Sequence, residues 1–254
     1  MSFFQAENLS VQFGGIRAVD AVSFEVREGE VFSIIGPNGA GKTTIFNLIS
    51  RIYTPTSGRL MFRGHDITTT PPYQVAARGI ARTFQNIELF ANATVLQNLL
   101  IGCHCHVRTG ILSQIVFLPA ARRDELVHRE RAEDVIAFLG LQRYRQTLIA
   151  GLPYGVRKVV ELGRALCTEP KLLLLDEPSS GLNVEETEGM GFWIADIKNV
   201  LGITVIMVEH DMSLVGAVSD RVLALNYGKV VAVGSTREVQ THPEVVKAYI
   251  GGAA

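Results

Sequence analysis

Val31-Phe-Ser-Ile-Ile-Gly36-Pro-Asn-Gly-Ala-Gly41-Lys42-Thr43 joins a short apolar run to a glycine-rich loop that ends in lysine and threonine. The apolar run is typical of a buried strand, and residues 42–50 carry apolar side chains at helical spacing. The loop matches the pattern G-x-x-x-x-G-K-[ST], with a strand before it and a helix after it, as phosphate binding requires. The stretch therefore predicts a P-loop. The alternative, a glycine-rich turn that merely caps a helix, does not account for the whole pattern.

The predicted phosphate contacts follow from the chemistry of this loop. Glycines let the backbone N–H groups turn inward, and the helix that follows presents its positive N-terminus to the same point. Lys42 is expected to reach the β- and γ-phosphates of ATP, and the Thr43 hydroxyl to bind Mg²⁺. The full predicted set is Gly36, Asn38, Gly39, Ala40, Gly41, Lys42, Thr43 and Thr44.

Strand and helix signals along the rest of the chain indicate the fold class. Further strands are predicted at residues 6–13, 21–26, 58–62, 171–175, 203–208, 221–225 and 230–233. Between residues 89 and 166 helical patterns dominate instead, with an amphipathic stretch at 122–139. We therefore expect an α/β protein with a mainly parallel core sheet. Residues 1–88 and 167–254 form the predicted nucleotide-binding core, and residues 89–166 an inserted helical subdomain.

An acidic pair follows the apolar run at residues 172–175. Asp176 and Glu177 then lie at the carboxyl end of a buried strand, where open α/β sheets bind ligands. Asp176 is suited to hold Mg²⁺ and Glu177 to orient and polarise the attacking water. Asp-Glu-Pro is also good turn chemistry, and a plain turn is the alternative.

Two more polar residues occupy comparable positions. His210 follows the strand at 203–208, which favours a contact with the γ-phosphate, although a lone histidine is more often structural or simply exposed. Gln85 lies where the core gives way to the helical insert. Its amide could reach the metal or the attacking water, and its alternative is an ordinary loop glutamine.

Taken in order, these motifs resemble those of ABC ATPases. The set is the P-loop, Gln85, Leu152-Pro-Tyr-Gly-Val156, Asp176-Glu177, Ser180-Gly-Leu-Asn183 and His210. The chain is more closely similar to the ATP-binding subunits of branched-chain amino acid importers. The segments that carry this likeness are Phe13-Gly-Gly, Arg82-Thr-Phe-Gln-Asn, Val208-Glu-His-Asp-Met212 and Pro243-Glu-Val-Val-Lys-Ala-Tyr-Ile-Gly251.

The resemblance implies a fold and a set of residue roles. The fold would be an ABC cassette whose parallel core is joined by an N-terminal antiparallel β subdomain and a helical signature subdomain. ATP would lie between two head-to-tail subunits, and Phe13 would stack on adenine unless it is a core phenylalanine. In the implied roles Lys42, Thr43 and Asp176 hold Mg-ATP, Glu177 is the catalytic base, His210 contacts the γ-phosphate, Gln85 senses the nucleotide and contacts the metal, and Tyr154 and Gly155 contact nucleotide.

The signature loop departs from the usual Leu-Ser-Gly-Gly-Gln. Pro153 replaces the serine, Tyr154 replaces a glycine and Val156 replaces the glutamine. Proline has neither a hydroxyl nor an N–H group, so two donors to the opposing γ-phosphate are lost. The Gly155 N–H group and the nearby helix start remain. We therefore expect weak hydrolysis without partners. Asn183 also stands where aspartate is usual and so removes a charge.

Composition limits the classes of partner. The chain has 254 residues and a net charge of -1, so no basic excess points to nucleic acid. No stretch approaches the roughly 18 apolar residues that suggest a membrane span. The three cysteines suit reduced thiols. By resemblance, the partners are two integral membrane permease subunits, a second ATP-binding subunit and, indirectly, an external solute-binding protein. The expected location is peripheral, on the cytoplasmic face of the inner (plasma) membrane.

Other functions and sites compete with this interpretation. One alternative is a soluble ABC ATPase that acts on ribosomes or DNA, although such proteins usually carry two cassettes or a long coiled coil. Another is a non-hydrolysing regulatory module, which the intact Lys42, Asp176 and Glu177 argue against but which Pro153 in the signature loop leaves open. Cys103-His-Cys-His106 resembles a metal cluster, but its donors are too bunched to enclose one zinc ion easily. The apolar run at 111–118 is expected to pack within the helical subdomain.

Overall fold

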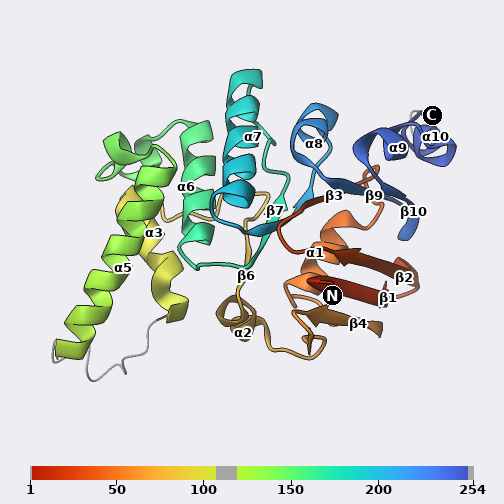
Figure 1. Cartoon of the computed structure of the whole chain (residues 1–254), viewed down its shortest axis with the longest axis horizontal. Helices are drawn as coiled ribbons and strands as arrows, with labels where there is room; N and C mark the ends of the chain where they lie inside the picture. Colours follow the sequence, from red (N-terminus) through yellow and green to blue (C-terminus); the bar gives the residue numbers. More distant parts are fainter. Residues whose placement is uncertain (1, 107–118, 251–254) are drawn as a thin grey trace.

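The computed structural model describes residues 2–106 and 119–250 and contains two β-sheets (Figure 1). The larger sheet has six strands in the order β10-β9-β3-β8-β7-β6. Its strands are β3 (Val31–Ile35), β6 (Ile80–Arg82), β7 (Leu172–Asp176), β8 (Thr204–Val208), β9 (Arg221–Asn226) and β10 (Lys229–Gly234). All neighbouring pairs are parallel except β9 and β10. The mainly parallel core sheet is thus confirmed.

The smaller sheet is antiparallel and comes from the N-terminal part of the chain. It has the order β2-β1-β4-β5, and its strands are β1 (Phe4–Phe13), β2 (Ile16–Val26), β4 (Ser57–Phe62) and β5 (His65–Asp66). Gly14, in the left-handed region with a φ of 57°, lies in the turn between β1 and β2. This sheet is the predicted antiparallel β subdomain.

Helices pack around both sheets. They are α1 (Lys42–Ile49), α2 (Pro72–Val75), α3 (Val95–Gly102), α5 (Pro119–Phe138), α6 (Tyr154–Leu166), α7 (Val184–Asn199), α8 (Met212–Val218), α9 (Thr236–Gln240) and α10 (Pro243–Ile250). Short 3₁₀ turns lie at 76–78, 103–106, 142–144 and 149–151. Helices α3, α5 and α6 gather at one end of the molecule, away from the antiparallel sheet (Figure 1). A division into subdomains at residues 88/89 and 166/167 stays a proposal.

The six-stranded sheet lies between two hydrophobic cores, because successive side chains of a strand point to opposite faces. Phe32 of β3 and Leu174 of β7 belong to the core shared with α1 and the antiparallel sheet. Ile35 of β3 and Leu173 of β7 belong to the core shared with the helices of residues 95–166. The carboxyl ends of β3 and β7 are therefore held from both sides.

The helices at this end pack closely against one another. A Cβ atom at Gly102 would lie 2.2 Å from the Arg164 carbonyl oxygen, so α3 and α6 approach with little space between their backbones. Cys103 is buried beside this contact.

Within the described ranges, no group of three or more His, Cys, Asp or Glu side chains could hold a metal ion. The apolar run at 111–118 lies outside those ranges. No helix in the described part of the chain has the length and hydropathy to span a membrane.

Candidate nucleotide-binding and hydrolysis site

The P-loop runs from the end of β3 into α1 through backbone conformations that glycine favours. Gly36 has a φ of 153°, and a Cβ atom there would lie 2.3 Å from the Leu225 carbonyl oxygen. Gly41 has a φ of 103°, and its Cβ would lie 2.7 Å from the Ala18 carbonyl oxygen. Both positions therefore exclude a side chain on grounds of space as well as conformation. The loop is wedged between the end of β9 and strand β2.

Lys42 lies at the start of α1 and is only 7% exposed. Its Nζ donates to the Gly36 carbonyl at 2.7 Å and to the Pro37 carbonyl at 3.0 Å. Burial lowers the pKa of Lys42, and the carboxylates of Glu177 and Asp176 oppose that shift. The ammonium therefore donates into its own loop and interacts electrostatically with Glu177, the predicted base, and with Asp176, the predicted magnesium ligand.

The other predicted P-loop residues surround this lysine. Asn38 and Gly39 are exposed, and Ala40 is buried. In the first turn of α1, Thr43 is exposed and Thr44 half-buried. The N-cap residue is Gly41, which has no side chain to accept from the first-turn N–H groups. The helix start is consequently suited to an anion.

Asp176 ends β7 and is 3% exposed. Its Oδ2 accepts from Arg82 Nη2 at 2.7 Å. Arg82 lies on the neighbouring strand β6, and its Nη1 also donates to Asn47 Oδ1 at 2.7 Å and to Ser50 Oγ at 2.9 Å. Arg82 is a site residue that the sequence alone did not reveal. This buried guanidinium fixes the Asp176 carboxylate against α1 and β6.

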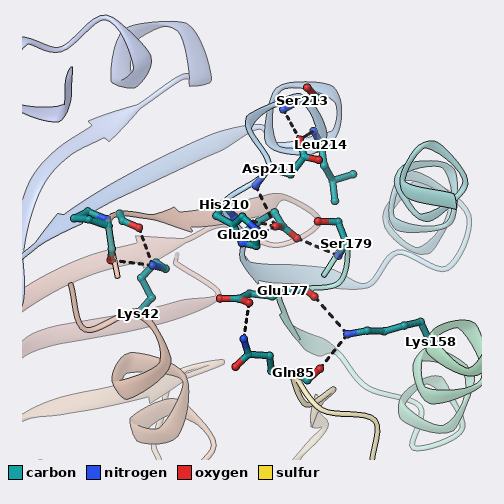
Figure 2. Close-up of polar contacts among 12 residues, drawn as sticks. Lys42, Gln85, Lys158, Glu177, Ser179, Glu209, His210, Asp211, Ser213 and Leu214 are labelled. Carbon is teal, nitrogen blue, oxygen red and sulfur yellow. Dashed lines mark hydrogen bonds and ion pairs between the residues drawn. The ribbon is translucent and has the colours of Figure 1, made fainter. Parts of the chain in front are cut away.

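Glu177 begins the loop after β7 in the left-handed conformation, with a φ of 48°. Its N–H group donates to the Val208 carbonyl at 2.9 Å. Gln85 Nε2 donates to Glu177 Oε2 at 2.6 Å (Figure 2). The structure thus brings together two predicted catalytic residues that are 92 positions apart.

His210 lies just after β8, and its side chain is 59% exposed. Its surroundings are organised by Glu209, a buried residue that our sequence analysis missed. Glu209 Oε1 accepts from the N–H groups of His210 and Asp211 at 2.8 and 3.1 Å. Its Oε2 accepts from the Ser179 N–H group at 3.2 Å, so one carboxylate joins the loops after β7 and β8 (Figure 2).

Phe13 ends β1 and is 46% exposed, which excludes the alternative of a core phenylalanine. Its ring lies edge-on to Tyr53, with centroids 5.0 Å apart. An aromatic side chain with so much free surface can offer a face to a flat ligand. Stacking on adenine stays a prediction.

The signature loop makes contacts inside its own chain. Pro153 is the N-cap residue of α6 and makes no side-chain capping bond. The Tyr154 hydroxyl donates to the Ser180 carbonyl at 3.4 Å. A Cβ at Gly155 would lie 2.2 Å from Glu186 Oε1, so a side chain here would require the Glu186 carboxylate to move. Contacts of Tyr154 and Gly155 with a nucleotide on a second subunit stay predictions.

Asn183 has a structural role that our sequence analysis did not anticipate. It is the N-cap of α7: its side chain accepts from the Glu186 N–H group at 2.9 Å, and Glu186 Oε2 accepts from the Asn183 N–H group at 3.0 Å. We expect Asn183→Ala to lower the free energy of unfolding by about 0.5–2 kcal/mol, measured by urea denaturation of the purified chain. Asn183→Asp keeps the cap and is the control. Equal stability of all three chains would contradict this role.

The chain belongs to the ABC transporter family, whose sequence profile matches residues 19–180. Within that family it is an ATP-binding cassette, a class of ATPases, as the sequence motifs predicted. It is similar to the high-affinity branched-chain amino acid transport ATP-binding protein LivG of Salmonella typhimurium, with 40% identity over 245 residues and 96% of each chain covered. The corresponding BraF protein of Pseudomonas aeruginosa is 38% identical over 249 residues, with 98% of each chain covered.

Solved structures agree with this assignment. The crystal structure of an ATP-binding cassette of an ABC transporter in its ADP conformation matches with a TM-score of 0.87 and 34% identity, covering 99% of each chain. A nucleotide-free cassette matches with a TM-score of 0.86 and 33% identity, covering 99% of this chain and all of the other. The predicted ABC cassette fold is confirmed, and nucleotide binding is the property these relatives share.

Proposed function

We propose that this chain powers an ABC importer by hydrolysing ATP in a head-to-tail dimer with an identical or related cassette. The solute would be a branched-chain amino acid or a related small amino acid, amide or organic acid. The observation that carries the proposal is the convergence of Lys42, Asp176 and Glu177 at the carboxyl ends of β3 and β7. The solute class is supported by the relatives named for branched-chain amino acid transport.

Mg²⁺ fits the donors present, because magnesium binds oxygen atoms. Thr43 offers a hydroxyl, Asp176 a carboxylate and Gln85 an amide oxygen. The Gln85 amide nitrogen is the atom that donates to Glu177, which leaves its oxygen for the cation. When bound, Mg²⁺ would neutralise charge on the β- and γ-phosphates.

In the reaction, water attacks the γ-phosphorus of ATP, the bond from that phosphorus to the β–γ bridging oxygen breaks, and ADP and phosphate are released. Glu177 orients the water and accepts its proton, and Lys42 stabilises charge on the phosphate oxygens. Gln85 donates to Glu177 Oε2, so Oε1 is the oxygen that would accept the proton from water. His210 is exposed just after β8 and would contact the γ-phosphate.

A membrane partner is supported by an apolar surface near β6. A cavity of about 430 Å³ is lined in part by Ile52, Phe84 and Ile101. These side chains are 49%, 39% and 43% exposed. Apolar groups gathered around a hollow are typical of a docking surface, so we assign this face to a permease subunit. Docking of this face on a permease subunit would place the chain peripherally on the cytoplasmic side of the membrane.

Affinity purification from native membranes tests this proposal. The tagged full chain is extracted in mild detergent, and the proteins that accompany it are identified by mass spectrometry. Two polytopic membrane proteins, with or without a second cassette, are the expected companions. Stoichiometric ribosomal or DNA-associated proteins without membrane subunits would overturn the transport role and leave the ATP site intact.

Phe13→Ala is expected to weaken ATP binding by the purified chain. Aromatic stacking on a base contributes about 1–3 kcal/mol, which corresponds to between roughly fivefold and a hundredfold in Kd. Calorimetric titration with ATP measures the change, and Phe13→Tyr, which keeps a flat ring, is the control. An unchanged Kd for Phe13→Ala would contradict adenine stacking.

A further inference from the structure

Three charged residues of α6 face the segment that carries Gln85. Lys158, Glu161 and Arg164 are spaced three apart and so lie on one side of the helix. Lys158 Nζ donates to the Gln85 carbonyl at 3.1 Å. Glu161 Oε1 accepts from the Glu88 N–H group at 3.4 Å, and Arg164 Nη1 donates to the Glu88 carbonyl. The helix therefore holds the backbone of residues 85–88 through polar contacts.

Lys158 also contacts the loop after β7, which carries Glu177. Its Nζ lies 3.5 Å from the Glu177 carbonyl oxygen, while the Gln85 and Glu177 side chains meet at 2.6 Å. Figure 2 shows this arrangement, with Lys158 extending from α6 to both residues. One ammonium thus contacts the backbones of two residues whose side chains are bonded to each other.

Lys158 is a buried cation among carboxylates. Lys158 is 4% exposed, and burial lowers its pKa against the opposing effect of four carboxylates, those of Glu161, Glu209, Glu177 and Asp176. Removing an ammonium from water costs free energy that an apolar side chain of similar length would avoid. The surrounding carboxylates offset part of this cost, so charge balance is one role of the lysine. The two carbonyl contacts are a second role, which charge balance alone does not require.

We propose that Lys158 is a positioning residue for ATP hydrolysis, which sets the placement of Gln85 relative to Glu177 through the backbones of both. Because α6 begins at Tyr154 of the signature loop, a displacement of this helix is transmitted through Lys158 to the Gln85–Glu177 contact. The proposal rests on the hydrolytic roles assigned above to these two residues.

Steady-state ATP hydrolysis by the complex with its membrane subunits tests this role. We expect Lys158→Met to lower kcat by between about tenfold and a hundredfold, because small misplacements of catalytic groups have effects of this size. The KM for ATP should change less than about twofold, since the P-loop is untouched. Lys158→Arg, which keeps a charged donor, should recover most of the rate. Lys171→Met, at an exposed position before β7, is the control.

A double-mutant cycle separates positioning from a general structural effect. If Lys158 acts through Gln85, adding Lys158→Met to Gln85→Ala should slow hydrolysis by much less than it slows the wild type. Multiplicative effects, or a wild-type kcat for Lys158→Met, would overturn the proposal. Should Lys158→Met fail to fold, Lys158→Gln, which keeps an amide donor without charge, takes its place in the cycle.

The outcomes also separate this inference from the proposed function. If the wild-type complex hydrolyses ATP, Glu177→Gln does not and Lys158→Met is unaffected, the positioning role alone fails. If the wild-type complex does not hydrolyse ATP, both the hydrolytic function and the positioning role are overturned.

Discussion

Glu177→Gln is expected to lower the rate of ATP hydrolysis by about 10²- to 10⁴-fold while ATP binding persists. Glutamine has nearly the same shape as glutamate but cannot take a proton from water. Its amide oxygen can still accept the hydrogen bond that Gln85 Nε2 now donates to Glu177. The backbone should tolerate the change, because the position already holds a non-glycine residue at a φ of 48°. The loss is therefore chemical rather than structural.

Single-turnover hydrolysis and equilibrium binding, measured on the same preparation, distinguish these effects. The Kd for ATP should stay within about threefold of wild type, since Glu177 acts on the water rather than on the nucleotide. Glu130→Gln, an exposed carboxylate on α5, is the matched control. A hydrolysis rate above a tenth of the wild-type value would exclude Glu177 as the base.

Lys42→Met should impair both binding and hydrolysis. The ammonium donates to two loop carbonyls in this structure, and a phosphate is a stronger acceptor than either. Charge-assisted hydrogen bonds of this kind contribute about 1.5–3 kcal/mol, so the Kd for ATP should rise by roughly ten- to a hundredfold. Because charge on the phosphate grows in the transition state, hydrolysis should fall further, by about 10²–10³ in kcat.

Methionine is the informative replacement for Lys42. The side chain is 7% exposed, and methionine retains its length and volume, so packing around the loop should survive. The measurements are calorimetric binding of ATP and the hydrolysis rate at saturating ATP, with Lys171→Met as the control. Full affinity in Lys42→Met would exclude the lysine from phosphate binding.

The elements that position the nucleotide could be predicted because their signals are local. The strand at 31–35 and the helix start at Lys42 agree with the structure. The predicted strand boundaries were less accurate where the alternation of apolar and polar residues along a strand is interrupted. Strand β2 begins at Ile16 rather than at residue 21, because its pairing with β1 contains register shifts that break the alternation. Strand β6 was missed, since its three residues, Ile80–Arg82, are too few to show a period.

The residues that organise the site could not be predicted in the same way. Arg82, Lys158 and Glu209 are buried charges whose partners are distant along the chain. In the sequence, an arginine or lysine among helical residues is typical of a solvated face, and the partner that makes burial tolerable is specified only by the fold. The residues predicted to act on ATP or Mg²⁺ could be proposed from the sequence because several of them follow strand ends, whereas the residues that support them have no such marker.

The pairing of Arg82 with Asp176 restricts how that carboxylate can serve a metal ion. With Oδ2 engaged by Arg82 Nη2, Oδ1 is the oxygen better placed for a cation, and chelation through both oxygens would compete with the guanidinium. Calcium, which takes six to eight oxygen ligands and often a bidentate carboxylate, would meet that competition here. Magnesium keeps much of its water and needs only one or two carboxylate oxygens. The bond from Arg82 to Asp176 would thus favour small, well-hydrated cations, although the guanidinium itself does not contact the cation.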